Sequence, residues 1–171
     1  PTAVFELSDD LVADWKPQLP DIFQALRKKL PLEESDEMTH FTLQPVLMEY
    51  LTEKLIAKGC EEIETGPIKL LNSHALLKAQ AKEYVRESQA RLILNPLLEK
   101  LEQRLAGRDR LQARLNQILS QTRIKPPQLP GYFTGNLLNL LCQLNVDLKG
   151  YDFSGLTVWQ AYLQQHDLQA V

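Results

Sequence analysis

The last 25 residues of the chain repeat with a period of five. From Asp147 they read DLKGY, DFSGL, TVWQA, YLQQH and DLQAV, and the second position of every block is apolar. Neither a helix, with 3.6 residues per turn, nor a strand, with a period of two, places every fifth residue on one face. A backbone that turns a corner every five residues does so. The pattern therefore predicts the start of a solenoid whose inner ladder is Leu148, Phe153, Val158, Leu163 and Leu168.

A solenoid coil needs a neighbouring coil to cover its apolar interior and its backbone edges. One coil of repeat at the end of a chain therefore predicts that this sequence is a piece of a longer protein. The first residue is Pro1 rather than methionine, which agrees with that expectation.

Composition is typical of a globular domain, with 44% hydrophobic and 24% charged residues. No apolar run approaches the roughly 18 residues of a membrane span, and no secretory signal opens the chain. Cys60 and Cys142 are too few for a disulfide framework or a zinc knuckle. We therefore expect a cytoplasmic protein without a membrane partner.

Charge is distributed unevenly along the chain. Residues 1–66 carry six basic and fourteen acidic residues, whereas residues 67–130 carry twelve basic and five acidic residues. The basic part predicts contact with a polyanion or with an acidic domain of the same protein. Tyr84 is its one aromatic residue, so there is little to stack on bases, and nucleic acid is the less favoured partner. The candidate contact residues are Arg86, Arg91, Arg104, Arg108, Arg110 and Arg114.

Apolar periodicity and turn residues divide the chain into three parts. Residues 1–66 predict most of a winged helix: helices at 8–15 and 21–29, a two-stranded wing, and a helix from Pro45 with Leu51 and Leu55 in its apolar stripe. The predicted helix at 21–29 offers polar and basic residues that suit DNA, but the net negative charge of residues 1–66 favours a contact with protein.

Residues 67–130 predict a helical linker or bundle. A long helix is expected from His74 to about Leu94, followed by a break at Asn95–Pro96, a second helix ending at Gly107, and a third helix. The expected buried stripe of the first helix is Leu77, Ala81, Tyr84, Ser88 and Leu92. The third helix is marked by Leu111, Leu115, Ile118 and Leu119.

Residues 131–171 predict a cap helix and the first repeat coil. A Pro-rich linker at 125–131 precedes a short, very apolar helix around residues 137–144, which would cover the open mouth of the solenoid. The predicted fold class is therefore mainly α, with a winged-helix-like unit and a helical hairpin or bundle.

No residue constellation indicates catalysis, and we assign no catalytic, metal-binding or cofactor-binding residue. His40, His74 and His166 lack a second ligand at metal-binding spacing. Cys142 lies among leucines and suits a small apolar role, while Cys60 is expected to be more exposed. The phosphate-binding pattern G-x-x-x-x-G-K-[ST] does not occur.

Three stretches carry a family resemblance: FTLQPVLMEYLTEKLI (41–56), LLNSHALLKAQAKEYVRESQARLIL (70–94) and GNLLNLLCQLNVDLKGYDFSGLTVWQAYLQ (135–164). In this order they resemble the region after the nucleotide-binding module of cyanobacterial signalling NTPases of the NB-ARC/STAND type, which end in pentapeptide or WD repeats. The resemblance implies that the tail starts a right-handed pentapeptide β-helix. Residues two positions before the ladder are usually small in such repeats, and here only Ala161 is, which indicates a transition coil.

The resemblance implies a non-catalytic regulatory segment that relays between an upstream nucleotide-binding module and a downstream repeat sensor. ATP or ADP would bind only the upstream module, and the partners would be other domains of the same polypeptide or other proteins. Two alternatives remain open: a winged-helix DNA-binding protein with a helical dimerisation arm, and a self-contained interaction scaffold.

Overall fold

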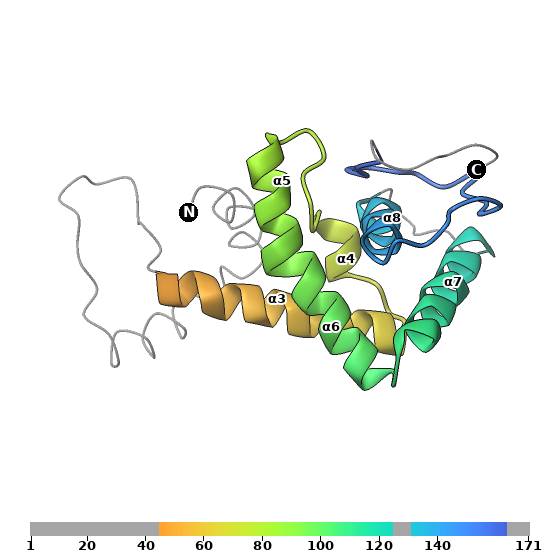
Figure 1. Cartoon of the computed structure of the whole chain (residues 1–171). Helices are drawn as coiled ribbons and strands as arrows, with labels where there is room; N and C mark the ends of the chain where they lie inside the picture. The colour runs from red at the N-terminus through yellow and green to blue at the C-terminus, as the bar shows by residue number, and fades with distance from the viewer. Residues whose placement is uncertain (1–44, 125–130, 164–171) are drawn as a thin grey trace.

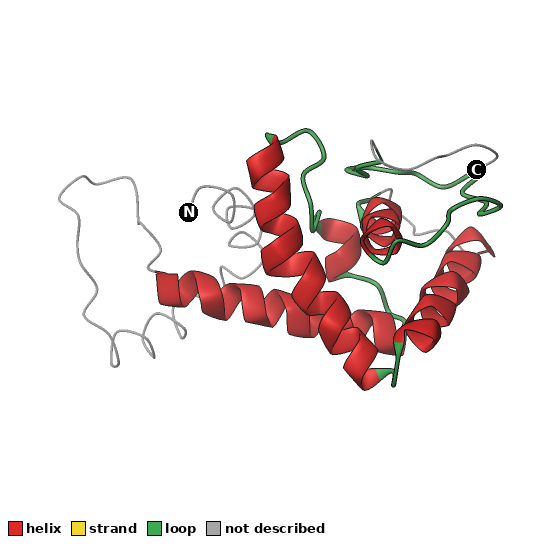
Figure 2. Ribbon diagram, in the orientation of Figure 1, coloured by secondary structure: helices red, strands yellow, loops and turns green. Residues whose placement is uncertain are grey.

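Residues 45–124 and 131–163 are described in the computed structural model of this chain. These two ranges form helices, turns and irregular segments without a β-strand (Figure 2), which confirms a mainly helical fold. The predicted wing and the two helices before it, most of the Pro-rich linker, and Leu168 lie outside the described residues. The helices are α3 (Pro45–Thr65), α4 (Leu70–Ser73), α5 (Glu83–Gln89), the π-helical turn η1 (Ala90–Leu94), α6 (Asn95–Arg104), α7 (Arg108–Ile124) and α8 (Phe133–Gln143).

The helices pack around α8 and across α3. Helices α5, η1 and α6 form one continuous rod that crosses α3, while α8 lies beside α4 and α7 (Figure 1). Helix α8 is rich in leucine, and every residue from Phe133 to Cys142 is buried. A helix of that composition is stable only when other elements surround it. The predicted apolar helix before the repeat is therefore confirmed, and it packs against α4, α7 and η1.

Helix α3 follows its sequence signals closely. It begins at Pro45, and Leu51 and Leu55 are buried as predicted. It ends where Gly66 adopts a φ of 102° and donates its N–H to the Glu62 carbonyl at 2.9 Å. A left-handed residue of this kind is the usual terminator of an α-helix.

The prediction of a helix starting at His74 is wrong. Residues 74–82 are irregular, and the helix starts at Glu83. The predicted stripe is confirmed only at Leu77, which is 5% exposed, whereas Tyr84 is 57% exposed and Leu92 39% exposed. The buried face instead carries Val85, Gln89 and Ile93. The physical reason is that side chains from distant elements bind the backbone of residues 74–82, as shown below.

The predicted break at Asn95–Pro96 is wrong as well. Proline lacks the N–H that would bond four residues back, and its ring crowds that carbonyl. The chain accommodates Pro96 by widening the preceding turn into η1, where the Asn95 N–H donates to Ala90 O, five residues back. The rod therefore continues through the proline instead of ending at it.

Two helices end in the same left-handed motif. After α6, Gly107 N–H donates to Glu102 O at 2.8 Å, with Ala106 at a φ of 57°. After α8, Val146 N–H donates to Leu141 O at 3.1 Å, with Asn145 at a φ of 50°. Both are Schellman caps, in which a residue of positive φ reverses the chain. The predicted end of a helix near Gly107 is confirmed.

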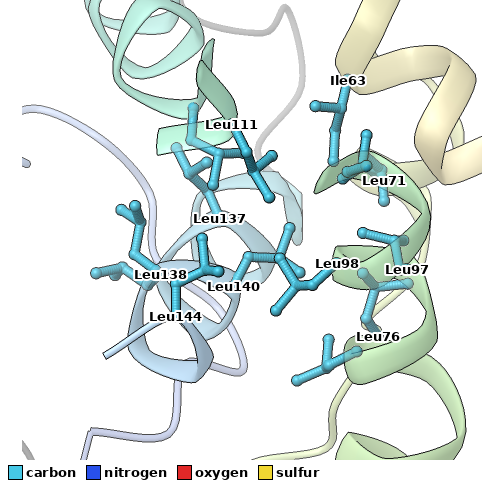
Figure 3. Close-up of a cluster of buried hydrophobic side chains, with 14 of the residues drawn as sticks. Ile63, Leu71, Leu76, Leu97, Leu98, Leu111, Leu137, Leu138, Leu140 and Leu144 are labelled. Carbon is cyan, nitrogen blue, oxygen red and sulfur yellow. The ribbon is translucent and has the colours of Figure 1, made fainter. Parts of the chain in front are cut away.

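One apolar cluster joins α3, α4, η1, α6, α7 and α8 (Figure 3). It includes Ile63 of α3, Leu97 of α6 and Leu140 of α8, each at most 1% exposed. The third predicted helix is confirmed as α7, and its four predicted core residues are buried. Because one core connects α3 with α8, these helices form one packed unit.

Candidate functional site: the C-terminal turns docked on helix α8

The backbone after α8 changes direction every five residues. Positive φ angles recur at Asn145, Gly150, Gly155 and Gln160, with values of 50°, 79°, 75° and 59°. Most residues with a side chain avoid this left-handed region, so the regular spacing of the four positive φ angles marks four corners of the backbone. Residues 146–163 contain no helix, and the five-residue period of the sequence is also the period of the backbone.

Two of the corners are β-turns with the same hydrogen bonds. Tyr151 N–H donates to Leu148 O at 3.0 Å, and Leu156 N–H donates to Phe153 O at 3.2 Å, which places Gly150 and Gly155 third in their turns. A positive φ at that position defines a type II turn. At each turn an aspartate side chain accepts a backbone N–H two residues further on, at 3.0 Å from Lys149 and 2.9 Å from Ser154.

The predicted ladder residues do not all face the core. Leu148 is 2% exposed, and Phe153 and Leu163 are partly buried against the apolar cluster. Val158 differs from the expectation, because its side chain is 39% exposed. At this corner the backbone after Val158, rather than the ladder side chain, contacts α8.

That contact depends on a glycine. A Cβ added to Gly135 would lie 1.7 Å from the carbonyl oxygen of Trp159 and 3.3 Å from the nitrogen of Ala161. Only a residue without a side chain lets the backbone of the turn approach α8 so closely. The rings of Trp159 and Tyr132 also meet edge to face, with centroids 5.7 Å apart.

Two buried asparagines of α8 hold two different irregular segments. Asn139 donates to Gln160 O at 2.8 Å and accepts from Tyr162 N–H at 2.9 Å. Asn136 accepts from Leu76 N–H at 2.8 Å and donates to the carbonyls of residues 71 and 74 at 2.8 and 2.7 Å. Their spacing of three residues places both amides on neighbouring positions of one helix. Helix α8 therefore holds the C-terminal turns and the segment before α5 at the same time.

The two irregular segments also contact each other directly. Gln160 of the turns accepts the N–H of Ala79 at 2.7 Å through Oε1. The Arg86 guanidinium lies 4.3 Å from the centroid of the Tyr162 ring and donates to the carbonyls of Ala79 and Ala81. A planar cation over a ring and two carbonyl acceptors make Arg86 a bridge between α5, the loop and the turns.

Sequence reasoning treated α8 as a purely apolar cap and missed Asn136 and Asn139. Asparagines inside an apolar run were the available signal, because buried polar side chains in native proteins have hydrogen-bond partners. The pattern GNLLNLL could therefore have indicated backbone clamping, but not which segments are clamped.

Three of the six predicted contact arginines bind this chain itself. Besides Arg86, Arg104 pairs with Glu64 at 3.3 Å, and Arg114 donates to the Ile63 and Glu64 carbonyls at 2.8 and 3.0 Å. Cations at the last carbonyls of a helix stabilise its C-terminus. For the exposed residues Arg91, Arg108 and Arg110, contact with a polyanion or another domain stays a prediction.

Among the described residues, His74, Cys60 and Cys142 show no reactive arrangement, whereas His40 and His166 lie outside the described ranges. His74 is buried with its Nδ1 2.8 Å from Ser73 Oγ. Cys60 is fully buried, so its predicted exposure is wrong; it packs where α3 meets α6, and burial raises the pKa of its thiol. Burial likewise raises the pKa of Cys142 to about 11. Within the described ranges, no three His, Cys, Asp or Glu side chains converge as metal ligands would.

A shallow depression of about 360 Å³ lies where the loop meets the turns. Ala79, Gln80, Val158, Tyr162 and Leu163 are among the residues that line it. None of its lining residues within the described part of the chain carries a charge that would bind an anionic ligand. None of the helices in residues 45–124 and 131–163 is long and apolar enough to cross a bilayer.

Comparison with known proteins shows that the chain is similar to one part of a longer protein. The whole chain aligns, at 40% identity over 205 positions, with part of a protein of Nostoc sp. (strain PCC 7120) described as an uncharacterized WD repeat-containing protein. The chain spans 16% of that relative's length. No protein-family model and no solved structure matches the chain.

Proposed function

We propose that this chain is a non-catalytic regulatory segment of a longer repeat-containing signalling protein. It would relay between a nucleotide-binding module of the NB-ARC/STAND type and a repeat sensor. The observation that carries the proposal is the docking of regularly spaced turns onto α8, inside the same core that contains α3. The Nostoc relative is described as a WD repeat-containing protein, which supports a role in protein–protein contact.

The proposed mechanism is a shift between conformational populations. A ligand on the sensor would favour one arrangement of the turns, and the shared core would pass that preference to α3 and to the module packed before it. Such coupling requires that the ligand bind the two states with different affinity. ATP or ADP would bind the upstream module, and this chain would supply packing surfaces and no reacting group.

Calorimetry tests the first part of this proposal. We expect no heat of binding when ATP or ADP with magnesium is added to the isolated 171-residue chain. The matched positive control is a longer protein that carries this segment together with its nucleotide-binding module, and it should bind. Micromolar affinity of the isolated chain for nucleotide would contradict the assignment.

A gel-shift series with duplex DNA separates the alternative. Three of the six candidate arginines bind the chain's own carbonyls and carboxylates, so we expect little retardation at physiological salt. Tight binding that falls steeply between low and physiological salt would favour a DNA-binding protein.

A further inference from the structure

Residues 75–82 combine a helix-forming sequence with a non-helical backbone. They read ALLKAQAK, and every one of these residue types belongs to the strongest helix formers. None of the eight residues lies in a helix. Local preference and observed conformation therefore conflict over the whole segment, which is unusual in a native sequence and points to a functional site.

No capping residue marks the N-terminus of α5. The N-cap position is Lys82, which makes no side-chain capping bond, and lysine is not a capping residue. Helix α5 already provides a nucleus, so extending it backward into residues 75–82 needs no new nucleation step. No capping side chain therefore fixes the residue at which α5 begins.

Contacts from other elements hold the segment in its irregular form. The N–H groups of Leu76, Lys78 and Ala79 donate to the side-chain oxygens of Asn136, Gln89 and Gln160, at 2.8, 2.9 and 2.7 Å. A helix would direct these N–H groups to its own carbonyls instead. One of the three acceptors, Gln160, belongs to the C-terminal turns, and the bridging Arg86 stacks on Tyr162 of the same turns.

We propose that residues 75–82 are a conformational switch controlled by the C-terminal turns. With the turns docked on α8, the segment is held in its irregular form; with the turns released, it continues α5 toward the N-terminus as a helix. As a helix the eight residues span about 12 Å, against up to about 28 Å when extended. The switch thus changes the distance that the segment between α4 and α5 can span. Only the biological role of this switch depends on the proposed relay function; the conformational change itself does not.

Gly135→Ala in the full chain is the test, because the added methyl group cannot coexist with the Trp159 carbonyl. Gly59→Ala is the matched control: it also adds a methyl group to a buried helical glycine, but meets the side chain of Leu97 at 2.8 Å and not the turns. Backbone chemical shifts of residues 75–82 and 159–162 are measured by NMR in both variants. We expect Gly135→Ala to shift residues 159–162 away from their native values and all of residues 75–82 toward helical values, and Gly59→Ala to do neither.

Two further variants keep the outcome decisive. If Gly135→Ala fails to fold, Asn139→Ala releases the turns by removing two hydrogen bonds without a clash. Adding Gln80→Gly to the releasing variant should abolish the helical shifts, because glycine lowers helix propensity and Gln80 is exposed.

Coil-like shifts at residues 75–82 after release of the turns would overturn the switch, and so would native shifts there. If the turns stayed docked in both Gly135→Ala and Asn139→Ala, the proposal would also be overturned, since the geometry at these two residues would then not control docking. Nucleotide binding by the isolated chain would defeat the proposed relay and leave this result unaffected.

Discussion

Glu62 offers the sharpest test of how the helical unit is held together. Its side chain is 2% exposed, near the C-terminal end of α3. One carboxylate oxygen accepts the N–H of Leu70 at 2.8 Å, and the other accepts those of Lys69 and Leu71 at 3.1 and 3.0 Å. These N–H groups open α4 and have no partner within that four-residue helix. A single buried carboxylate therefore connects α3 to α4.

The expected magnitude follows from those three bonds. A hydrogen bond to a charged group contributes about 1.5–3 kcal/mol, and a buried donor left without a partner is unfavourable by about 1–3 kcal/mol. The Lys69 N–H can turn to water, because Lys69 is exposed. We expect Glu62→Ala to lower the free energy of unfolding by about 3–5 kcal/mol. Glu62→Gln keeps one acceptor oxygen and should lower it by about 2–3 kcal/mol.

Guanidinium denaturation followed by circular dichroism measures these differences, with an unchanged slope as the sign of two-state unfolding. Glu61→Ala is the matched control, since Glu61 is exposed and pairs only with its neighbour Lys58, at 2.9 Å, among the described contacts. Its unfolding midpoint should stay near that of the native chain. If Glu62→Ala unfolded at the same midpoint as Glu61→Ala, the buried carboxylate would not be holding α4.

Two other predictions concern the backbone and the thiols. Ala106→Gly should raise the free energy of unfolding by about 1 kcal/mol, because Ala106 has a φ of 57°, which glycine adopts without strain; a lower thermal midpoint would be inconsistent with the Schellman cap. The pKa of Cys142 is raised to about 11 from its ordinary value of 9.0 because the thiol is buried, so the folded chain holds this proton more tightly than the unfolded chain does. Its contribution to stability is complete below pH 9 and is lost as the pH rises toward 11, so the stability of Cys142→Ala should fall less over that range than that of the native chain; equal pH profiles would argue against the buried thiol.

Local sequence signals were sufficient for α3, α7 and α8. In α3 and α7 the apolar period of a helix coincides with the buried face, and in α8 the run is too apolar to lie at a surface. Gly66 and Gly107 stand just after α3 and α6, where terminating glycines are expected. These signals act within a few residues, which is why they can be recognised without the fold.

The errors between His74 and Leu94 have a different origin. The segment 75–82 has a helical composition, and two of the three side-chain contacts that hold it out of a helix come from Asn136 and Gln160, more than 50 residues away. Tertiary contacts override local propensity at such places. Pro96 was expected to break the rod because a π turn that absorbs a proline leaves no signature in residue type.

The candidate site was only partly predictable. The five-residue period of the sequence corresponds to corners at Gly150 and Gly155, but the exposure of Val158 follows from the approach of the backbone to Gly135. The partners of the arginines depend on which carbonyls the fold brings near them, and for Arg114 these are the last carbonyls of α3. Charge counting cannot reveal such partners.

Amide hydrogen exchange, read residue by residue by NMR, tests most directly whether side-chain amides clamp the loop and the turns together. The decisive protons are the backbone N–H groups of Leu76, Lys78, Ala79 and Tyr162, which lie outside every helix and donate to Asn136, Gln89, Gln160 and Asn139. We predict that they exchange at least roughly 100-fold more slowly than the same sequence unfolded, as buried hydrogen-bonded amides do. Exchange of these four protons at the rate of an unstructured chain would contradict the clamp.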